Sequence, residues 1–300
     1  MEYKMISVKC NLCGADDYKV KYEPWVTDID LKNYLSASGG IMGVNRIVKC
    51  NQCGLVYVNP QLQADSVIDA YSNSTDELYV SQAKGREITF KKCLNLVEKH
   101  APQKGKILDI GCAAGFFIKV AKENGWNIHG VEVSKWLAEY GKKELGLNIF
   151  AGTLAEAKYQ DSMFDVITMW DVLEHTPDPT TVLAEVNRIL KKDGVLFINW
   201  PDEGSVLTKL AGKKWWFYLS NHMYYFTDKT LADMLKKAGF QPFKSGLHFQ
   251  ILALSHLIKM VGLYNKFISN ISLKFVNAFG MSNLNIPYYA AQSYMIARKN

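Results

Sequence analysis

Apolar runs and amphipathic stretches alternate along the middle of the chain, and this pattern predicts its fold class. Four apolar runs have the length and composition of buried strands: residues 106–110, 127–133, 164–170 and 194–200. Three further stretches carry apolar residues at helical spacing: residues 116–125, 136–146 and 178–194. Strands that alternate with helices predict an α/β fold with a doubly wound parallel sheet, in which ligands bind beyond the carboxyl ends of the strands.

The flanking segments divide the chain into further parts. Residues 1–60 carry two cysteine pairs and are expected to form a small β-rich zinc-ribbon module. Residues 61–104 are expected to be a helical linker or cap before the α/β domain of residues 105–300. The helices expected in that linker span residues 64–72 and 82–100. Near the C-terminus, residues 246–290 predict a helical insertion into the α/β domain.

The net charge of +6 is concentrated in the last part of the chain. Residues 234–300 contain eight lysine and arginine residues and no aspartate or glutamate. This asymmetry indicates an anionic partner such as a membrane, a phosphate-bearing lipid or nucleic acid, and a solvated basic face is an equally good interpretation. The first ten residues are too polar for a signal peptide, and no run of about 18 apolar residues predicts a spanning helix, so a cytoplasmic protein is expected.

Two short cysteine motifs predict a metal site in the N-terminal module. The sequences CNLCG at Cys10–Gly14 and CNQCG at Cys50–Gly54 each place two thiols three residues apart in a turn. Four thiolates are typical ligands of a structural, tetrahedral zinc ion. The expected ligands are Cys10, Cys13, Cys50 and Cys53. The alternative is two unrelated cysteine pairs, which the repeated pattern disfavours.

The segment KILDIGCAAGFF at residues 106–117 places a glycine-containing loop between a predicted strand and a predicted helix. The dinucleotide fingerprint G-x-G-x-x-G, aligned on Gly111, requires glycine at the position of Ala113 and glycine or alanine at the position of Phe116. Both positions fail this test, so a nicotinamide or flavin dinucleotide is disfavoured. S-adenosylmethionine has no phosphate and therefore demands less of the loop.

The motif LDIGCAAG resembles the first motif of class I S-adenosylmethionine-dependent methyltransferases, D-x-G-x-G-x-G. Asp109, Gly111 and Gly115 match this motif, and Ala113 departs from it. Three further stretches are similar to family motifs: FDVITMWDVLEHTPDP (164–179), ILKKDGVLFINWP (189–201) and HMYYFTDKTL (222–231). The resemblance implies a seven-stranded, mostly parallel, Rossmann-like sheet. In one branch of the family a zinc ribbon precedes this domain, and members of that branch are often linked to methylation of sugars, glycans or secondary metabolites.

The same resemblance implies a set of cofactor-binding residues. Glu132 matches the acid that binds the ribose hydroxyls. This role suits a carboxylate, because it has two acceptor oxygens. The alternative interpretation is that Glu132 is an exposed turn residue. Trp170 and Asp171 are expected to border the methionine end of the cofactor, and Thr153 stands where relatives often carry an acid near the adenine. The full expected set is Asp109, Gly111, Cys112, Ala113, Gly115, Glu132, Val133, Thr153, Leu154, Trp170 and Asp171.

Methyl transfer to a hydroxyl needs a base, because an alcohol is a poor nucleophile until its proton is removed. His175 and His222 are the candidate catalytic bases, and the alternative for each is a structural histidine bonded to the backbone. The aromatic run WWFYLSNHMYYF around His222 offers flat faces for a sugar ring or a lipid interface, although about half of it is expected to be core. The candidate substrate contacts in this run are Trp215, Trp216, Tyr224 and Tyr225.

Residues 248–281 are largely apolar and contain no charged residue other than lysine. Three interpretations stay open for this segment: a lid over the acceptor, a dimer interface, or an amphipathic anchor on anionic lipid. An anchor would suit a lipid-linked acceptor and a cytoplasmic protein that is peripheral to the membrane.

The leading hypothesis is an O-methyltransferase that uses S-adenosylmethionine, contains structural zinc, and acts on a hydroxyl of a sugar, glycan precursor or related small metabolite. The alternative is a nucleic-acid (RNA) methyltransferase or binder that uses the zinc ribbon and the basic C-terminal region. No nucleic-acid partner is expected, because WDVLEH stands where enzymes that methylate base amines commonly carry a polar residue, two prolines and an aromatic, and because the ribbon lacks a dense basic and aromatic stripe. A non-catalytic binding module is a third hypothesis. The acceptor and the oligomeric state stay open.

Overall fold

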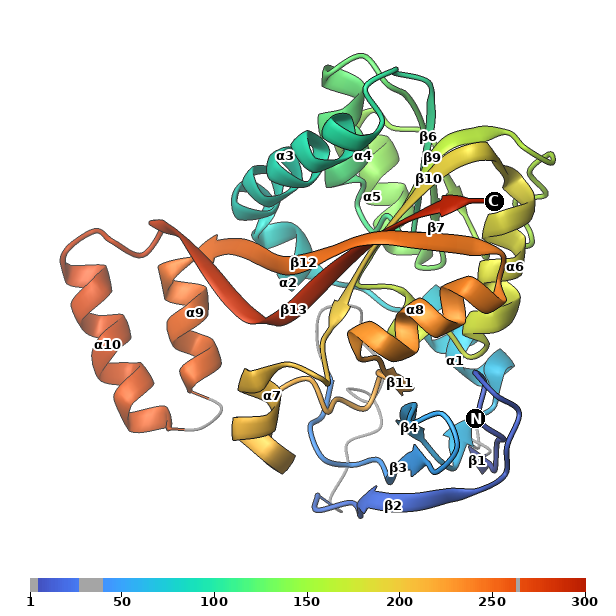
Figure 1. The fold of residues 1–300 in the computed structure, drawn as a ribbon. Helices are drawn as coiled ribbons and strands as arrows, with labels where there is room; N and C mark the ends of the chain where they lie inside the picture. The colour runs from blue at the N-terminus through green and yellow to red at the C-terminus, as the bar shows by residue number, and fades with distance from the viewer. Residues whose placement is uncertain (1–4, 27–39, 263–264) are drawn as a thin grey trace.

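The computed structural model describes residues 5–26, 40–262 and 265–300, and a seven-stranded sheet forms its centre (Figure 1). The strands lie in the order β12-β13-β10-β9-β6-β7-β8. Their bounds are β6 Lys106–Ile110, β7 Asn127–Glu132, β8 Ile149–Ala151, β9 Phe164–Trp170, β10 Leu190–Pro201, β12 Phe240–Ala253 and β13 Asn285–Lys299. The five strands from β10 to β8 pair in parallel, whereas β13 pairs antiparallel with both of its neighbours. The sheet is therefore mixed, and the expectation of a mostly parallel sheet is only partly met.

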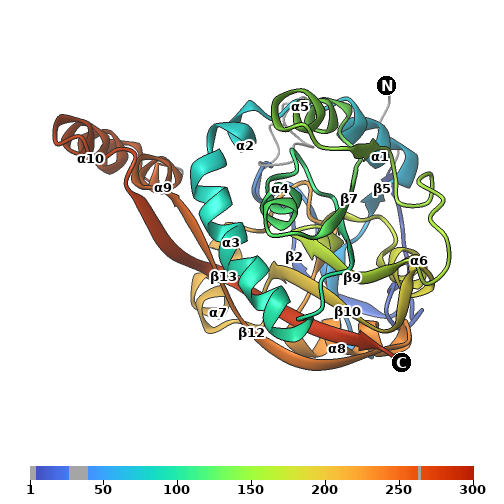
Figure 2. The same ribbon diagram turned by 90° about the horizontal axis from the view of Figure 1, so that it is seen from above.

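Helices cover both faces of this sheet, because alternate residues of each central strand point to opposite sides. Leu108 packs in one core cluster with residues of α6 (Pro179–Ile189) and α8 (Asp228–Lys237). Its neighbour Ile107 packs in a second cluster with residues of α3 (Ala83–His100) and α4 (Phe116–Glu123). The parallel crossovers place helix α5, Lys135–Leu145, between β7 and β8. Figure 2 shows the strands enclosed between these helices. The predicted α/β alternation is confirmed.

The N-terminal module forms a second, four-stranded sheet in the order β11-β4-β3-β2. Its strands are β2 Tyr18–Tyr22, β3 Ile47–Cys50, β4 Val56–Val58 and β11 Tyr224–Tyr225. The last strand belongs to the α/β domain, where it lies between β10 and α8 in sequence, and it pairs with β4 through Tyr224 and Tyr57. A short strand pair, β1 (Met5–Ile6) with β5 (Gln61–Leu62), closes the module. The module therefore shares one strand with the region that carries His222.

The segment between the two sheets is helical, as expected from its pattern. Helix α1 spans Ala64–Ser72, α2 spans Glu77–Ser81, and α3 follows directly after a short turn. Helix α7, Val206–Ala211, lies after β10, and two short 3-10 helices span Leu173–His175 and Gly212–Lys214.

The helical insertion near the C-terminus is shorter than the expected residues 246–290. Strand β12 continues to Ala253, and β13 begins at Asn285, which pairs with Ala253. Among the described residues of this insertion, only α9 (Leu254–Val261) and α10 (Lys266–Ala278) are helical, because the flanking residues complete a long two-stranded ribbon. In Figures 1 and 2 these helices project from the body at the tip of that ribbon. Of the helices that can be described, none has the length and apolar character needed to cross a bilayer.

Candidate active site

The loop from β6 to α4 turns through three left-handed backbone positions. The φ angles are 65° at Gly111, 49° at Ala113 and 85° at Gly115. A Cβ atom at Gly111 would lie 2.7 Å from Cγ2 of Val172, and one at Gly115 would lie 2.6 Å from Cδ1 of Leu147. Both outer positions therefore require glycine for space as well as conformation, whereas Ala113 occupies a conformation that alanine adopts at a cost.

Glu132 holds this loop directly. Its Oε2 accepts a 2.8 Å hydrogen bond from the N–H of Ala113, and its Oε1 accepts a 2.7 Å bond from the N–H of Ser134. Burial raises the pKa of Glu132, while these backbone N–H groups favour its ionised form and lower that pKa. The structure therefore brings together the predicted ribose acid and the residue that departs from the loop motif.

Asp109 lies at the end of β6, beneath the loop. Its Oδ1 accepts a 2.6 Å hydrogen bond from the hydroxyl of Thr168 on β9. Burial is the main reason that the pKa of Asp109 rises to about 8, with a further increase from the charge of Glu132 and an opposing effect of the Thr168 bond. The carboxyl group thus ties two adjacent strands together at the point where the loop leaves the sheet.

The segment that joins α1, α2 and α3 packs close to this loop. The hydroxyl of Ser134 donates a 3.0 Å hydrogen bond to the carbonyl of Ser74, just after α1. The ring of Tyr79 stacks on Phe116, with ring centroids 5.7 Å apart, and the guanidinium of Arg86 lies 3.7 Å above the Tyr79 ring. Sequence reasoning missed Ser74, Tyr79 and Arg86, because the helical pattern of residues 61–104 did not indicate which side chains face the loop.

Residues after β8, which the resemblance predicts to border the adenine, form a local hydrogen-bonded turn. The N–H and hydroxyl of Thr153 donate bonds of 2.7 and 2.8 Å to Oε2 of Glu156. Leu154 is buried beside them, and Val133 is half-buried after β7. Glu156 was missed, although a threonine followed three residues later by glutamate is a known local signal. This pair places a carboxylate directly beside Thr153.

Asp171 follows β9 in the left-handed conformation, with a φ of 55°. Its Oδ1 accepts hydrogen bonds from Nδ2 of Asn199 at 2.7 Å and from Nε2 of Gln292 at 2.6 Å. Its Oδ2 accepts a 3.1 Å bond from Nε2 of Gln250. Desolvation is the main reason that its pKa rises to about 6. Asp171 therefore links the end of β9 to side chains of β10, β12 and β13.

Trp170, the other residue expected near the methionine end, packs between aromatic rings. Its ring stacks with His248 at 6.2 Å and meets Phe117 edge-on at 5.4 Å. Cys112 is buried in the loop, and a Cβ atom at Gly130 would lie 2.9 Å from its sulfur. Contact of either residue with a cofactor remains a prediction.

Glu174, His175 and His222 form a compact polar cluster just after β9. The two imidazole rings meet edge-on, with centroids 4.5 Å apart. Nδ1 of His175 lies 2.9 Å from the carbonyl of Asn221 and 3.0 Å from the hydroxyl of Tyr71. Because a carbonyl can only accept, Nδ1 carries the proton and Nε2 is the basic nitrogen.

The cluster also holds buried polar atoms that need a partner. Both carboxyl oxygens of Glu174 lack a hydrogen-bond partner among residues 5–26, 40–262 and 265–300. Nδ1 of His222 also lacks a partner among these residues. Buried groups of this kind are usually paired, so a bound water or an ion is the partner expected for these atoms. Sequence reasoning identified both histidines and missed Glu174, although it directly precedes His175.

Desolvation keeps both histidines neutral. It lowers the pKa of His175 to about 4, and it lowers the pKa of His222 well below its usual value, with a further decrease from His175. Burial, followed by the charge of Asp171, raises the pKa of Glu174 well above its usual range. Both imidazoles are therefore neutral at pH 7, and each is a weaker base than an exposed histidine. The ligand atoms of the three residues lie within 4.8 Å of one another, a donor set that could also bind a divalent cation.

The aromatic run is mostly core, a larger share than the half that was expected. Trp215 and Tyr225 are buried against Ile47 and Val56 of the ribbon sheet. Tyr224 is buried as well, and its hydroxyl donates a 3.0 Å bond to the carbonyl of Pro177. These three side chains pack between the two sheets, and their contact with an acceptor stays a prediction. Trp216 is half-buried.

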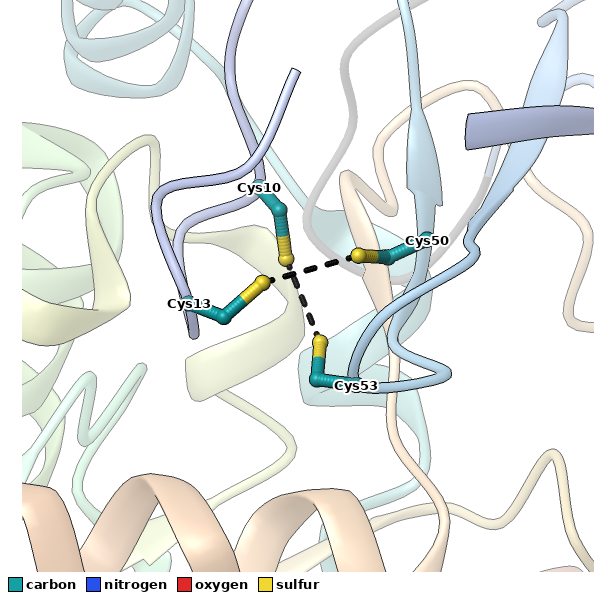
Figure 3. A group of neighbouring side chains, drawn as sticks. All are labelled: Cys10, Cys13, Cys50 and Cys53. Carbon is teal, nitrogen blue, oxygen red and sulfur yellow. Dashed lines mark hydrogen bonds between the residues drawn. The ribbon is translucent and has the colours of Figure 1, made fainter. Parts of the chain in front are cut away.

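The four cysteines of the N-terminal module converge as expected (Figure 3). The sulfur of Cys10 lies 3.4 Å from that of Cys53, the sulfur of Cys13 lies 3.5 Å from that of Cys50, and all four lie within 4.8 Å of one another. A tetrahedral ion with metal–sulfur bonds of about 2.3 Å separates its ligands by about 3.8 Å. The cluster therefore fits a closed four-thiolate site, and the separations are too long for disulfides, whose sulfurs lie about 2.05 Å apart.

Comparison with known proteins agrees with this geometry. The profile of a family described as "Methyltransferase domain" matches residues 82–244. An uncharacterized protein of Methanocaldococcus jannaschii is 29% identical over 184 residues, which are 60% of this chain and 83% of that protein. A ubiquinone biosynthesis O-methyltransferase of Actinobacillus pleuropneumoniae is 34% identical over 104 residues, which are 31% of this chain and 44% of that enzyme.

A solved structure supports the fold in the same way. The YcgJ protein of Bacillus subtilis superimposes with a TM-score of 0.51 at 19% identity, over 70% of this chain and 99% of that protein. Because the family profile covers more than half of the chain and includes the β6–α4 loop, Glu132 and the histidine cluster, the protein belongs to the methyltransferase-domain family of class I S-adenosylmethionine-dependent enzymes.

Proposed function

We propose that this protein transfers a methyl group from S-adenosylmethionine to a hydroxyl of a sugar, glycan precursor or related small metabolite. The observation that carries the proposal is the neutral pair His175 and His222 beside the unpartnered Glu174, at the carboxyl end of β9. A buried neutral imidazole with an unpaired nitrogen is suited to accept the proton of a hydroxyl. The relatives named ubiquinone biosynthesis O-methyltransferase also methylate oxygen, according to their names.

In the proposed mechanism His222 is the base. When bound, the cofactor supplies a methyl group on a positively charged sulfur. Nδ1 of His222 accepts the hydroxyl proton, and its ring is held by stacking on Phe217 at 5.9 Å and by contact with His175. The carboxyl group of Glu174 lies within 4.8 Å of both imidazoles, and in its ionised form it would stabilise the imidazolium that forms. His175, whose Nδ1 is bonded to the Asn221 carbonyl, orients this arrangement.

The remaining predicted residues would position the cofactor. Glu132 is proposed to bind the ribose, the loop at Gly111–Gly115 to pass beneath the methionine part, and Thr153 with Leu154 to border the adenine. Positioning contributes strongly to displacement reactions, since well-oriented reactants reach effective concentrations on the order of 10⁵ M or more.

We also propose that the four-cysteine cluster binds zinc and that its role is structural. Four thiolates leave no open position for a substrate. The ribbon sheet includes β11, and the N–H of Val58 donates a 2.9 Å bond to the carbonyl of Met223, the residue after His222. A metal that stabilises the ribbon would therefore also hold His222 in place.

The proposal can be tested with methyl-labelled S-adenosylmethionine and an extract of the source cells. The products would be separated into nucleic acid, lipid-linked glycan and small soluble fractions. Label in the glycan or sugar fractions supports the proposal, provided that a His222→Asn variant does not produce it. Label in nucleic acid would contradict the proposal and favour a nucleic-acid substrate.

A further inference from the structure

The helical tip of the β12–β13 ribbon presents apolar side chains to solvent. Phe267, Phe275 and Phe279 are 73%, 59% and 65% exposed. Ile268 and Ile271 are also exposed, and together these residues outnumber the exposed large apolar side chains on any other described helix. Exposed apolar patches on proteins usually mark an interaction surface. We propose that α10 and the residues that follow it, 266–281, dock onto the surface of a bilayer that contains anionic lipid.

The exposed residues form one continuous stripe on α10. At about 100° per residue, Phe267, Ile268, Ile271 and Phe275 fall within an arc of about 100°. The rings of Phe275 and Phe279 lie 4.5 Å apart and extend the stripe past the end of the helix. This arrangement gives the helix an apolar face of the width that interfacial helices insert among lipid headgroups.

A different face of α10 packs on α9, so the exposed stripe is separate from the face that contacts the rest of the protein. The hydroxyl of Ser269 donates a 2.9 Å bond to the carbonyl of Ile258 on α9, and Ser269 and Val276 are buried. At about 100° per residue these two positions lie on nearly the same side of the helix, away from Ile271 and Phe275. The pair of helices therefore has its own internal contact and a second apolar face left for a partner.

The positive charges around the stripe favour anionic lipid as the partner of this apolar face. Lys259, Lys266 and Lys274 are exposed on the two helices, and residues 234–300 contain no aspartate or glutamate. Lys274 lies at the edge of the stripe, where a long side chain can place its ammonium group at the headgroups while the apolar face inserts. A two-fold contact through α10 would bring the lysines of two copies into one interface, and residues 234–300 supply no acid to neutralise them.

The shape of the molecule allows this contact. The tip lies at the end of a two-stranded ribbon at the β12 edge of the sheet, clear of the body in both views (Figures 1 and 2). A flat surface can therefore reach α10 without displacing the core or the site after β9. The inference goes beyond the proposed methyl transfer, because it stands whether or not the acceptor is lipid-linked.

The test is vesicle flotation of the full-length protein. Vesicles of phosphatidylcholine alone would be compared with vesicles in which about a third of the lipid is phosphatidylglycerol, at low and high salt. The variant Phe267→Ser/Phe275→Ser removes the centre of the stripe. The matched control is Leu210→Ser on α7, since Leu210 is 80% exposed but lies on a different element. Thermal unfolding checks that both variants are folded, and sedimentation velocity reports self-association.

We expect the wild type and Leu210→Ser to float with anionic vesicles, less so at high salt, and the double variant to bind at least about tenfold more weakly. Three results would overturn the inference: no flotation of the wild type with anionic vesicles, equal flotation with neutral vesicles, or an equal loss in Leu210→Ser and the double variant. A dimer that the double variant abolishes, without vesicle binding, would assign the surface to a second copy instead.

Discussion

The backbone N–H of Ala113 donates a 2.8 Å hydrogen bond to Oε2 of Glu132, so the acid after the second core strand fixes the conformation of the loop after the first. This contact joins the one residue that departs from the family motif to the residue expected to bind ribose. Ala113 keeps a left-handed φ of 49° in spite of its methyl group, and the bond to Glu132 is one reason that it can do so.

Replacing Ala113 with glycine should stabilise the protein. Glycine adopts the left-handed conformation without strain, and we expect the free energy of unfolding to rise by about 0.5–1 kcal/mol. Urea denaturation measures this change. Ala114→Gly is the matched control, because Ala114 is buried and has no positive φ, and it should destabilise the protein. A loss of stability in Ala113→Gly would contradict the assigned loop strain.

Glu132→Gln should weaken the binding of S-adenosylmethionine. The amide can offer only one acceptor oxygen, so the N–H of either Ala113 or Ser134 would face an amino group. We expect the Kd to rise at least about tenfold, since charge-assisted hydrogen bonds of this kind contribute about 1.5–3 kcal/mol. Isothermal titration calorimetry measures it. Glu139→Gln changes an exposed acid on α5 and should leave the Kd unaltered; equal effects of the two variants would refute the role of Glu132.

His222→Asn should affect turnover far more than cofactor binding. Removing a general base costs about 10²–10⁴ in rate, so we expect kcat to fall at least about 100-fold with a nearly unchanged Kd for the cofactor. Single-turnover kinetics with a hydroxyl acceptor, paired with calorimetry, separate the two quantities. His100→Asn, at the end of α3, serves as the control. Normal turnover in His222→Asn would remove this residue from the mechanism.

His175 should make the protein less stable in acid. Its pKa is about 4 in the folded protein against 6.5 ordinarily, so the unfolded chain takes up the proton first as the pH falls. The stability present above pH 6.5 is therefore lost progressively down to about pH 4, by about 3 kcal/mol in total.

The measurement is urea unfolding of the wild type and of His175→Asn between pH 7 and pH 4. Asp109, whose pKa is raised to about 8, acts in the opposite sense, and its contribution cancels when the two proteins are compared. The difference in unfolding free energy between them should shrink as the pH falls. A difference that stays constant would show that His175 is not held neutral.

Cys50→Ser should abolish metal binding by the ribbon. We expect about one zinc ion per chain in the wild type and almost none in the variant, because a four-thiolate site loses its closed geometry with one ligand. Mass spectrometry of the metal content measures this. Cys93→Ala changes a buried cysteine of α3 outside the cluster and should keep its zinc. Equal zinc content in both variants would exclude the proposed site.

The sequence by itself determined the features that depend on local order along the chain. The strands Lys106–Ile110 and Phe164–Trp170 and the helix Ala64–Ser72 have the predicted bounds, because hydrophobic period and turn residues act over a few positions. The loop at Gly111–Gly115 was identifiable for the same reason, since steric limits on glycine positions are local. The repeated cysteine motif likewise indicated one shared cluster.

Only the tertiary structure decided which distant side chains meet. The pairing of β11 with β4, the burial of Trp215 and Tyr225 between two sheets, and the position of the unpartnered Glu174 beside His222 all join residues far apart in sequence. The sequence pattern of an aromatic run or a histidine does not distinguish a side chain in the core from one that faces a ligand. Burial and hydrogen bonding distinguish these cases, because both depend on which segments the whole fold packs together.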